Sequence, residues 1–111
     1  MNLHTIGLNH KSAPVEIREK LAFNASSIPI ALSSFTQSFS SSEAVILSTC
    51  NRVEIYGTSP DDCLNKESLL DFFSAFHGLP KETFSEHMYH YQNLDAVKHL
   101  FFVTSSLDSL V

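Results

Sequence analysis

Apolar residues recur along this chain with two different periods, and the succession of the two predicts an α+β fold. Alternation with a period of two, or a short apolar run rich in β-branched residues, is typical of a strand. A spacing of three to four residues marks the buried face of a helix. The first pattern predicts strands over residues 3–9, 44–49, 53–58 and 88–92. The second predicts helices over residues 14–21, 26–39, 69–76 and 94–111.

The order of these segments indicates a particular sheet topology. A strand, a helix in two pieces, two strands, a helix and a fourth strand match the ferredoxin-like split β-α-β arrangement. That fold has an antiparallel sheet with helices on one face, and here it is followed by the start of a connecting helix. We therefore expect residues 1–92 to form the ferredoxin-like domain and residues 93–111 to belong to the helix after it.

Several residues predict where the elements begin and end. Only Cys50, Asn51 and Arg52 separate the second strand from the third, so these residues should form the tip of a hairpin. Ser12 and Asn93 precede helical stretches and are expected to be their N-cap residues.

Composition restricts the class of protein. A chain of 111 residues with 43% hydrophobic and 17% charged residues is typical of one soluble domain, and its first residues show no secretory signal. We therefore expect a cytoplasmic protein that does not enter a membrane. The net charge of -5 would repel a polyphosphate backbone, and three glycines cannot supply a dinucleotide-binding fingerprint. The six histidines show no metal-ligand spacing, so no structural metal is predicted.

The two cysteines stand in opposite electrostatic surroundings. Cys50 has Arg52 two residues on, and a nearby guanidinium favours the reactive thiolate. Cys63 follows Asp61 and Asp62, whose charges disfavour a thiolate, so we expect it to be inert. Cys50 is therefore the candidate nucleophile. The alternative is that it is a small buried core residue, as free cysteines often are.

Arg52 and His99 also allow two interpretations each. Arg52 could form a surface ion pair with Glu54 or Glu43, or act as a fork for a substrate carboxylate. A histidine in an apolar helix, such as His99, is more often a satisfied core residue than a catalyst.

Three segments of the chain resemble glutamyl-tRNA reductases. Residues 7–19 read GLNHKSAPVEIRE, residues 47–56 read LSTCNRVEIY, and residues 105–111 read SSLDSLV. The similarity runs over the whole chain in the right order and is most specific around Cys50. It implies the NADPH-dependent reduction of glutamyl-tRNA to glutamate 1-semialdehyde, the first step of tetrapyrrole (5-aminolevulinate) biosynthesis.

The resemblance also implies roles for individual residues. Cys50 would attack the aminoacyl ester and form a glutamyl thioester, which is a better hydride acceptor than an oxygen ester. Arg52 would hold the substrate carboxylate. Thr49 and Asn51 would supply hydrogen bonds on either side of the thiol.

Two further roles fall on the last helix, which the resemblance makes a part of the active site. His99 would orient the ester or move a proton, and Ser109 would contact the substrate. In an unbroken helix Ser109 lies about 15 Å from His99, so the two cannot touch the same atom unless the helix bends. The chain departs from the family at Ser106, where glycine is expected, and it lacks the Gly-Glu-Pro-Gln segment expected after Val111.

The resemblance places the cofactor and other partners elsewhere. NADPH would bind outside residues 1–111, in a domain that the family carries further along its chain. The full-length protein is expected to be a homodimer that acts on glutamyl-tRNA and works with a downstream aminomutase. The alternative is a small ferredoxin-like regulatory or interaction module without catalysis. A reactive thiol at Cys50, but not at Cys63, would separate the two.

Overall fold

The secondary structure agrees closely with the predicted order. The computed structural model describes residues 2–109, with side chains described through residue 105. Its strands and helices are β1 (Asn2–Asn9), α1 (Val15–Leu21), α2 (Ser27–Ser38), β2 (Glu43–Ser48), β3 (Arg52–Ser59), α3 (Lys66–His77), β4 (Tyr89–Gln92) and α4 (Leu94–Ser109). Two short 3₁₀ helices, η1 (Lys81–Thr83) and η2 (Ser85–His87), connect α3 to β4.

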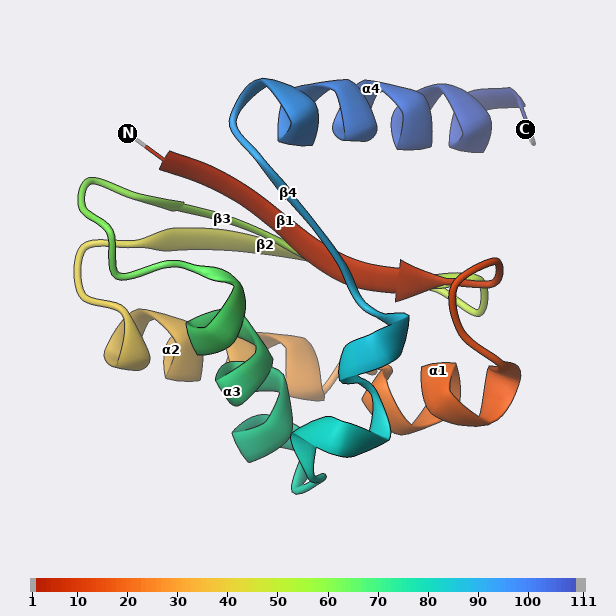
Figure 1. Ribbon diagram of the computed structural model, residues 1–111, viewed down its shortest axis with the longest axis horizontal. Helices are drawn as coiled ribbons and strands as arrows, with labels where there is room; N and C mark the ends of the chain where they lie inside the picture. Colours follow the sequence, from red (N-terminus) through yellow and green to blue (C-terminus); the bar gives the residue numbers. More distant parts are fainter. Residues whose placement is uncertain (1, 110–111) are drawn as a thin grey trace.

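The four strands form one sheet in the order β2-β3-β1-β4, and every neighbouring pair is antiparallel. Helices α1, α2 and α3 cover one face of this sheet (Figure 1). The prediction of an α+β, ferredoxin-like domain is confirmed. The hairpin is confirmed as well, because β2 ends at Ser48 and β3 begins at Arg52.

The face covered by α1, α2 and α3 holds the apolar core. Alternate residues of β1 and β3, such as Ile6 and Val53, are fully buried there. They pack against phenylalanines of α2 and α3, including Phe35 and Phe73, which are also fully buried. Phe84 joins the same core from the segment after α3. This layer forms because the apolar face of the sheet packs against the apolar faces of the helices.

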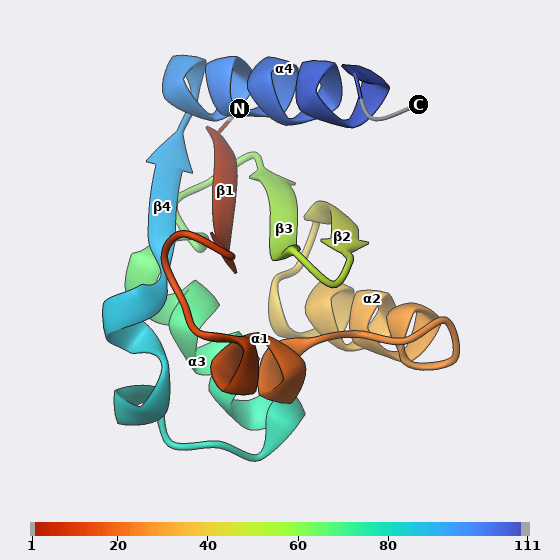
Figure 2. The same cartoon turned by 90° about the vertical axis from the view of Figure 1, so that its right-hand side faces the viewer.

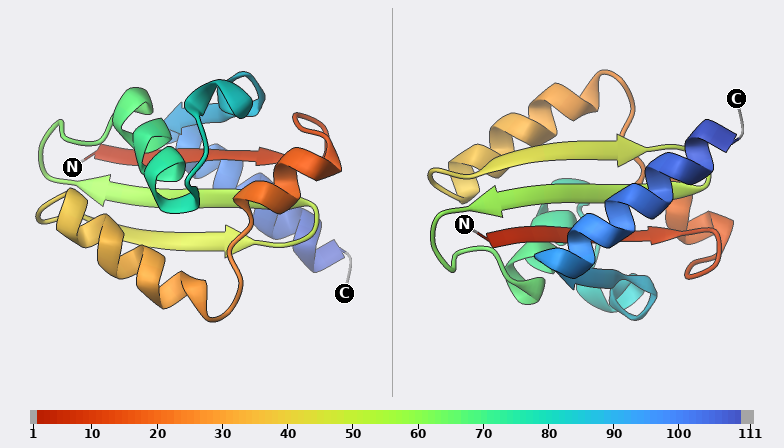
Figure 3. Two further views of the ribbon diagram at one scale, coloured as in Figure 1. Left: turned by 90° about the horizontal axis from the view of Figure 1, so that it is seen from below. Right: turned by 90° about the horizontal axis from the view of Figure 1, so that it is seen from above.

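The opposite face of the sheet is covered by α4, which crosses the strands diagonally (Figure 3). The sequence predicted a helix that leaves the domain, whereas its buried residues Ala96 and Val103 show that it also packs on the sheet. Its outer side keeps Phe101 and Phe102 exposed. No helix within residues 2–109 is long and apolar enough to span a membrane.

Asn93 is the residue before α4, as predicted, and its carbonyl accepts the backbone N–H of Val97 at 3.0 Å, whereas Ser12 is not the N-cap of α1. Ser12 accepts the backbone N–H of Asn9 at 3.0 Å and so closes the turn after β1, while α1 begins after Pro14 without a side-chain cap. Asn93 adopts a left-handed backbone with φ 52°, and its side chain accepts the backbone N–H of Leu3. Each side chain accepts a hydrogen bond from a backbone N–H group that the helical spacing does not indicate.

Candidate active site

The hairpin tip between β2 and β3 presents Cys50 to solvent. Thr49 Oγ1 accepts the backbone N–H groups of Asn51 and Arg52, each at 3.2 Å. The backbone N–H of Thr49 donates to the carbonyl of Arg52 at 2.8 Å. Cys50 itself is exposed and free. The tip is therefore a closed turn that holds an accessible thiol, which excludes the interpretation of Cys50 as a buried core residue.

A second arginine fixes this tip to the rest of the domain. Arg18 of α1 donates from Nε to the carbonyl oxygen of Cys50 at 3.2 Å and from Nη1 to the carbonyl oxygen of Ala13 at 2.7 Å. Figure 2 shows α1 and the hairpin turn at the same end of the molecule. Sequence reasoning missed Arg18, although it lies inside the first family-like segment. Its contact with Cys50 spans 32 residues and leaves no local pattern.

Glu54 lies at the centre of a buried polar cluster beneath α4. Its side chain is fully buried, and its Oε2 accepts hydrogen bonds from Tyr89 at 2.6 Å and from His99 Nε2 at 2.5 Å. Arg52 Nη1 forms an ion pair with the same oxygen at 3.2 Å. Tyr56 donates to Oε1 at 2.8 Å. One carboxylate thus joins Arg52 on the hairpin to His99 on the last helix.

The cluster excludes the interpretation of Arg52 as a surface ion pair. Glu54 is its partner, but the side chains of Arg52 and Glu54 are only 11% and 0% exposed. The sequence named Glu54 only as a possible surface partner. The signal that could have marked it is a carboxylate on a strand that is otherwise apolar and aromatic.

Burial and the carboxylate together keep the two phenols of the cluster protonated. Burial raises the pKa of Tyr56 well above its usual value, and the charge of Glu54 and its hydrogen bond raise it further. For Tyr89 the pKa is raised first by burial and then by the hydrogen bond and charge of Glu54. Both groups therefore remain hydrogen-bond donors throughout the neutral range.

A glycine on the neighbouring strand leaves the space that the side chain of Glu54 occupies. Gly7 lies opposite Glu54 on the neighbouring strand β1. A Cβ atom at this position would come within 2.3 Å of the carbonyl oxygen of Val53 and 2.7 Å of Cγ of Glu54. Any side chain here would displace the carboxylate.

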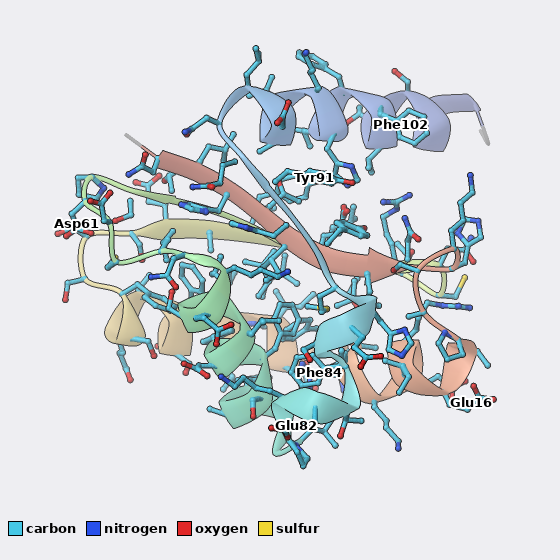
Figure 4. The ribbon with its side chains drawn as sticks, viewed as in Figure 1. Glu16, Asp61, Glu82, Phe84, Tyr91 and Phe102 are labelled. Carbon is cyan, nitrogen blue, oxygen red and sulfur yellow. The ribbon has the colours of Figure 1, made fainter. Side chains whose placement is uncertain are left out.

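Two aromatic rings hold His99 from the other side. Tyr89 and Tyr91 lie on β4, and their ring centroids are 5.2 Å and 4.8 Å from that of His99. Figure 4 shows Tyr91 between the sheet and α4, with Phe84 on the opposite side of the sheet. His99 is therefore neither an isolated core histidine nor a surface residue.

The other predicted site residues are more loosely placed. Thr49 and Asn51 are both exposed at the hairpin tip. The backbone of α4 runs unbroken from Leu94 to Ser109, which keeps Ser109 about 15 Å from His99. The side chains of Ser106 and Ser109 lie outside the described residues.

Cys63 has the acidic surroundings that the sequence predicted for it. Its thiol is 3.2 Å from the hydroxyl of Ser59. That hydrogen bond lowers the pKa of Cys63, but its hydrogen bond with Asp61, burial and the charge of Asp61 outweigh it and raise the pKa overall. A thiol held in the neutral form is a poor nucleophile.

The described residues form no recognisable metal centre. Among the described side chains, which end at residue 105, no three of His, Cys, Asp or Glu gather as a metal ion would require. Two histidines do lie together: the rings of His4 and His90 stack at 5.1 Å, with Nδ1 of His4 2.9 Å from Nε2 of His90.

Fold and site together define a class of protein. This is an α+β domain that displays a free thiol on a fixed hairpin, and it joins an arginine of that hairpin and a histidine of the last helix to one buried carboxylate. Comparison with known proteins gives the family. A family model described as the N-terminal domain of glutamyl-tRNA(Glu) reductase matches residues 6–111. The chain belongs to this family.

Individual relatives agree with this assignment. Glutamyl-tRNA reductase from Citrifermentans bemidjiense is 44% identical over 111 residues, which cover 100% of this chain and 26% of the relative. The protein of the same name from Thermodesulfovibrio yellowstonii is 48% identical over 118 aligned positions, covering 100% of this chain and 28% of the relative. The chain thus spans about a quarter of the length of these relatives.

A solved structure has the same fold. Glutamyl-tRNA reductase from Methanopyrus kandleri superimposes with a TM-score of 0.69 at 32% sequence identity. The match covers 96% of this chain and 23% of that one. The sheet and its helices are therefore those of the N-terminal domain of this family.

Proposed function

We propose that this chain is the catalytic domain of a glutamyl-tRNA reductase, the enzyme that reduces glutamyl-tRNA to glutamate 1-semialdehyde at the start of tetrapyrrole synthesis. The observation that carries the proposal is the exposed thiol of Cys50 on a hairpin tip that Thr49 and Arg18 hold in place. Membership of the family indicates the substrate, and the exposed thiol of Cys50 is the group that supports the proposed acyl transfer.

The first half of the reaction is an acyl transfer. The thiolate of Cys50 attacks the ester carbonyl that links glutamate to its tRNA, and the carbon–oxygen bond to the ribose breaks. The ribose oxygen takes a proton, and a glutamyl thioester remains on Cys50. NADPH, which would bind outside residues 1–111, would supply the hydride that converts the acyl group to the aldehyde and restores the thiolate. The 111 residues therefore contribute the nucleophile and its support.

The neighbouring side chains fit defined parts of this step. Arg52 binds the substrate carboxylate through the guanidinium edge that faces away from Glu54, and this distinguishes glutamate from uncharged amino acids. His99 donates the proton to the leaving ribose oxygen or orients the ester. Thr49 and Asn51 donate hydrogen bonds beside the thiol, and Ser109 contacts the substrate further along α4.

The rest of the proposal concerns the complete protein. Residues 1–92 form the ferredoxin-like catalytic domain, and residues 93–111 form the helix that completes the active site and leads toward further domains. Those domains bind NADPH and form a homodimer, and an aminomutase takes up the product. The greater length of the relatives leaves room for such domains and supports this division.

The test of the nucleophile measures acyl transfer alone. Glutamyl-tRNA is incubated with the complete reductase in the absence of NADPH, and released tRNA and the intact mass of the protein are measured over time. We expect a glutamyl adduct on the parent protein, none on Cys50→Ala, and an unchanged adduct on the matched control Cys63→Ala. Release of tRNA by Cys50→Ala at the parent rate would refute the assignment.

The same pair of cysteines tests the alternative of a module without catalysis. An alkylating reagent at pH 7 should modify Cys50 well before Cys63, because Cys50 is exposed whereas the pKa of Cys63 is raised. Equal rates of labelling would favour the interaction module.

A further inference from the structure

Two arginines lie near Cys50, and their positive charges are balanced in different ways. Arg52, two residues further along the hairpin, forms an ion pair with the carboxylate of Glu54 at 3.2 Å. The side chains of this pair are 11% and 0% exposed, so the carboxylate is a permanent neighbour of the guanidinium. The charge of Arg52 is therefore compensated inside the protein. Closeness in the sequence does not by itself make Arg52 the cation that acts on the thiol.

Arg18, on α1, has neutral partners instead. Its Nε donates to the carbonyl oxygen of Cys50 at 3.2 Å, and its Nη1 donates to the carbonyl oxygen of Ala13 at 2.7 Å. No ion pair among the described side chains includes Arg18. A guanidinium stays protonated, and a carbonyl oxygen does not neutralise it. Because Arg18 bonds to Cys50 itself, an uncompensated positive charge lies within one residue's length of the sulfur.

The neighbouring charges on α1 are further into solvent than that of Arg18. Glu16, Glu19 and Lys20 are exposed, whereas Arg18 is half-buried between the helix and the hairpin. Salt and water screen exposed charges more strongly than partly buried ones. Among the charged groups of α1, Arg18 is thus the one whose field the thiol should feel most.

The packing of α1 fixes where this charge lies. Leu21, on the same helix, is fully buried in the core. The backbone N–H of Phe23, just after the helix, donates to Oγ of Ser48 at the end of β2, at 2.9 Å. The segment is thus joined to the β2–β3 hairpin both at Ser48 and, through Arg18, at Cys50. A planar guanidinium held by two carbonyl oxygens keeps a defined position.

We propose that Arg18 is a positioning residue that supports the nucleophile electrostatically, because it holds a positive charge beside the sulfur of Cys50 when the thiol loses its proton to solvent. This rests on the function proposed above. Arg18 touches no reacting atom and acts through Cys50. The thiolate is the form that attacks an ester, and a nearby cation favours that form over the thiol.

The test compares two alkylating reagents of different charge on the complete reductase at pH 7. Iodoacetate is an anion and iodoacetamide is neutral, and mass spectrometry of the Cys50 peptide gives both rates. Arg18→Gln should slow the reaction with iodoacetamide by about two- to fivefold, which is the effect of an exposed ion pair. It should slow the reaction with iodoacetate more, because a positive site also attracts the anionic reagent. Formation of the glutamyl adduct should slow as well.

A second substitution separates the charge from the hydrogen bonds. Arg18→Lys disturbs the same two hydrogen bonds as Arg18→Gln but keeps the positive charge, so the ratio of the iodoacetate rate to the iodoacetamide rate should stay near that of the parent. A purely structural role would give equal losses in the two variants. Lys20→Gln is the matched control, because it removes a cation from the same helix without touching the hairpin. It should leave both rates at the parent values.

Each outcome decides one proposal. The parent ratio in Arg18→Gln, or equal losses in Arg18→Gln and Arg18→Lys, would overturn the role of Arg18. If Arg18→Gln does not fold, the parent protein supplies the test. Its ratio should fall as salt is raised from about 0.01 M to about 1 M, since the screening length shortens from about 30 Å to about 3 Å, and a constant ratio would overturn the role equally.

The alkylation rates require no tRNA, so they test Arg18 independently of the proposed reaction. Formation of the glutamyl adduct by Cys50→Ala would instead refute the proposed nucleophile. The two failures are therefore distinguishable.

Discussion

At the scale of single residues, Gly7 shows how a missing side chain maintains a polar cluster. Its backbone lies against the carbonyl of Val53 and the side chain of Glu54, with no space for a methyl group. The carbonyl belongs to a paired strand and cannot move without disturbing the sheet. Gly7 is therefore required by close packing rather than by backbone conformation.

Gly7→Ala should consequently destabilise the fold and disturb the site together. We expect the free energy of unfolding to fall by about 1–3 kcal/mol, which is the usual cost of adding a group to a well-packed interior. We also expect adduct formation at Cys50 to slow. Denaturant unfolding and the adduct assay measure the two effects. Gly57→Ala is the control, since its Cβ would meet the core side chains of Phe35 and Leu64 at 3.1 Å and 3.3 Å and no atom of Glu54. Equal slowing of adduct formation in both variants would contradict the explanation.

At the scale of elements, the hairpin and α1 act as one unit. A hairpin tip is exposed and held only by its own turn unless another element contacts it. Here Arg18 bridges the carbonyl oxygens of Cys50 and Ala13, and so connects the proposed nucleophile to the loop before α1. The position of the thiol thus depends on a helix that comes 32 residues earlier in the chain.

Arg18→Lys should loosen the tip and leave the rest of the fold intact. A single ammonium cannot donate to both carbonyls in the geometry of the guanidinium. We expect a loss of about 1–2 kcal/mol of local stability and roughly tenfold faster hydrogen exchange of the tip amides. Exchange mass spectrometry of peptides covering residues 47–54 would measure this. Unchanged hydrogen exchange in these peptides would show that the hydrogen bonds of Thr49 hold the tip in place without Arg18.

At the scale of the whole molecule, one buried histidine, His4, and two partly buried ones, His77 and His90, couple stability to pH. Burial lowers the pKa of His4, His77 and His90, and for His90 the charges of His4 and Lys66 lower it further. Nε2 of His77 is also buried with no hydrogen-bond partner among the described residues. All three side chains favour the neutral form in the folded state.

The sign of the pH effect is set by these lowered pKa values. The unfolded chain binds protons near the ordinary value of 6.5, whereas the folded chain binds them only at lower pH. Stability is therefore fully present above pH 6.5 and is lost as the pH falls toward the folded values. We expect a lower melting temperature at pH 5.5 than at pH 7.5, within a range in which most carboxylates stay ionised.

His77→Phe provides the matched variant for this effect. The ring packs against Phe23, Phe73 and Phe76, so phenylalanine suits the site and removes the unpartnered nitrogen. The variant should be more stable by about 1 kcal/mol at neutral pH and lose less stability on acidification. If His77→Phe lost more stability than the parent on acidification, His77 would not be a source of the pH dependence.

The sequence by itself determined the elements, the sheet topology, the hairpin tip and the family. These depend on local periodicity and on a contiguous motif around Cys50, both of which can be read within a few residues. The same local information failed at Ser12, because its side chain bonds to the backbone of Asn9 in the turn after β1 and does not cap α1.

Only the tertiary structure decided which polar side chains are partners of one another. Glu54 and His99 are 45 residues apart, and His4 and His90 are 86 apart, so no periodicity relates them. The packing of distant elements places α4 over the open face of the sheet and directs Arg52 toward a buried carboxylate. A hydrogen-bond network acquires its partners through packing, and packing brings together side chains whose sequence positions are independent of one another.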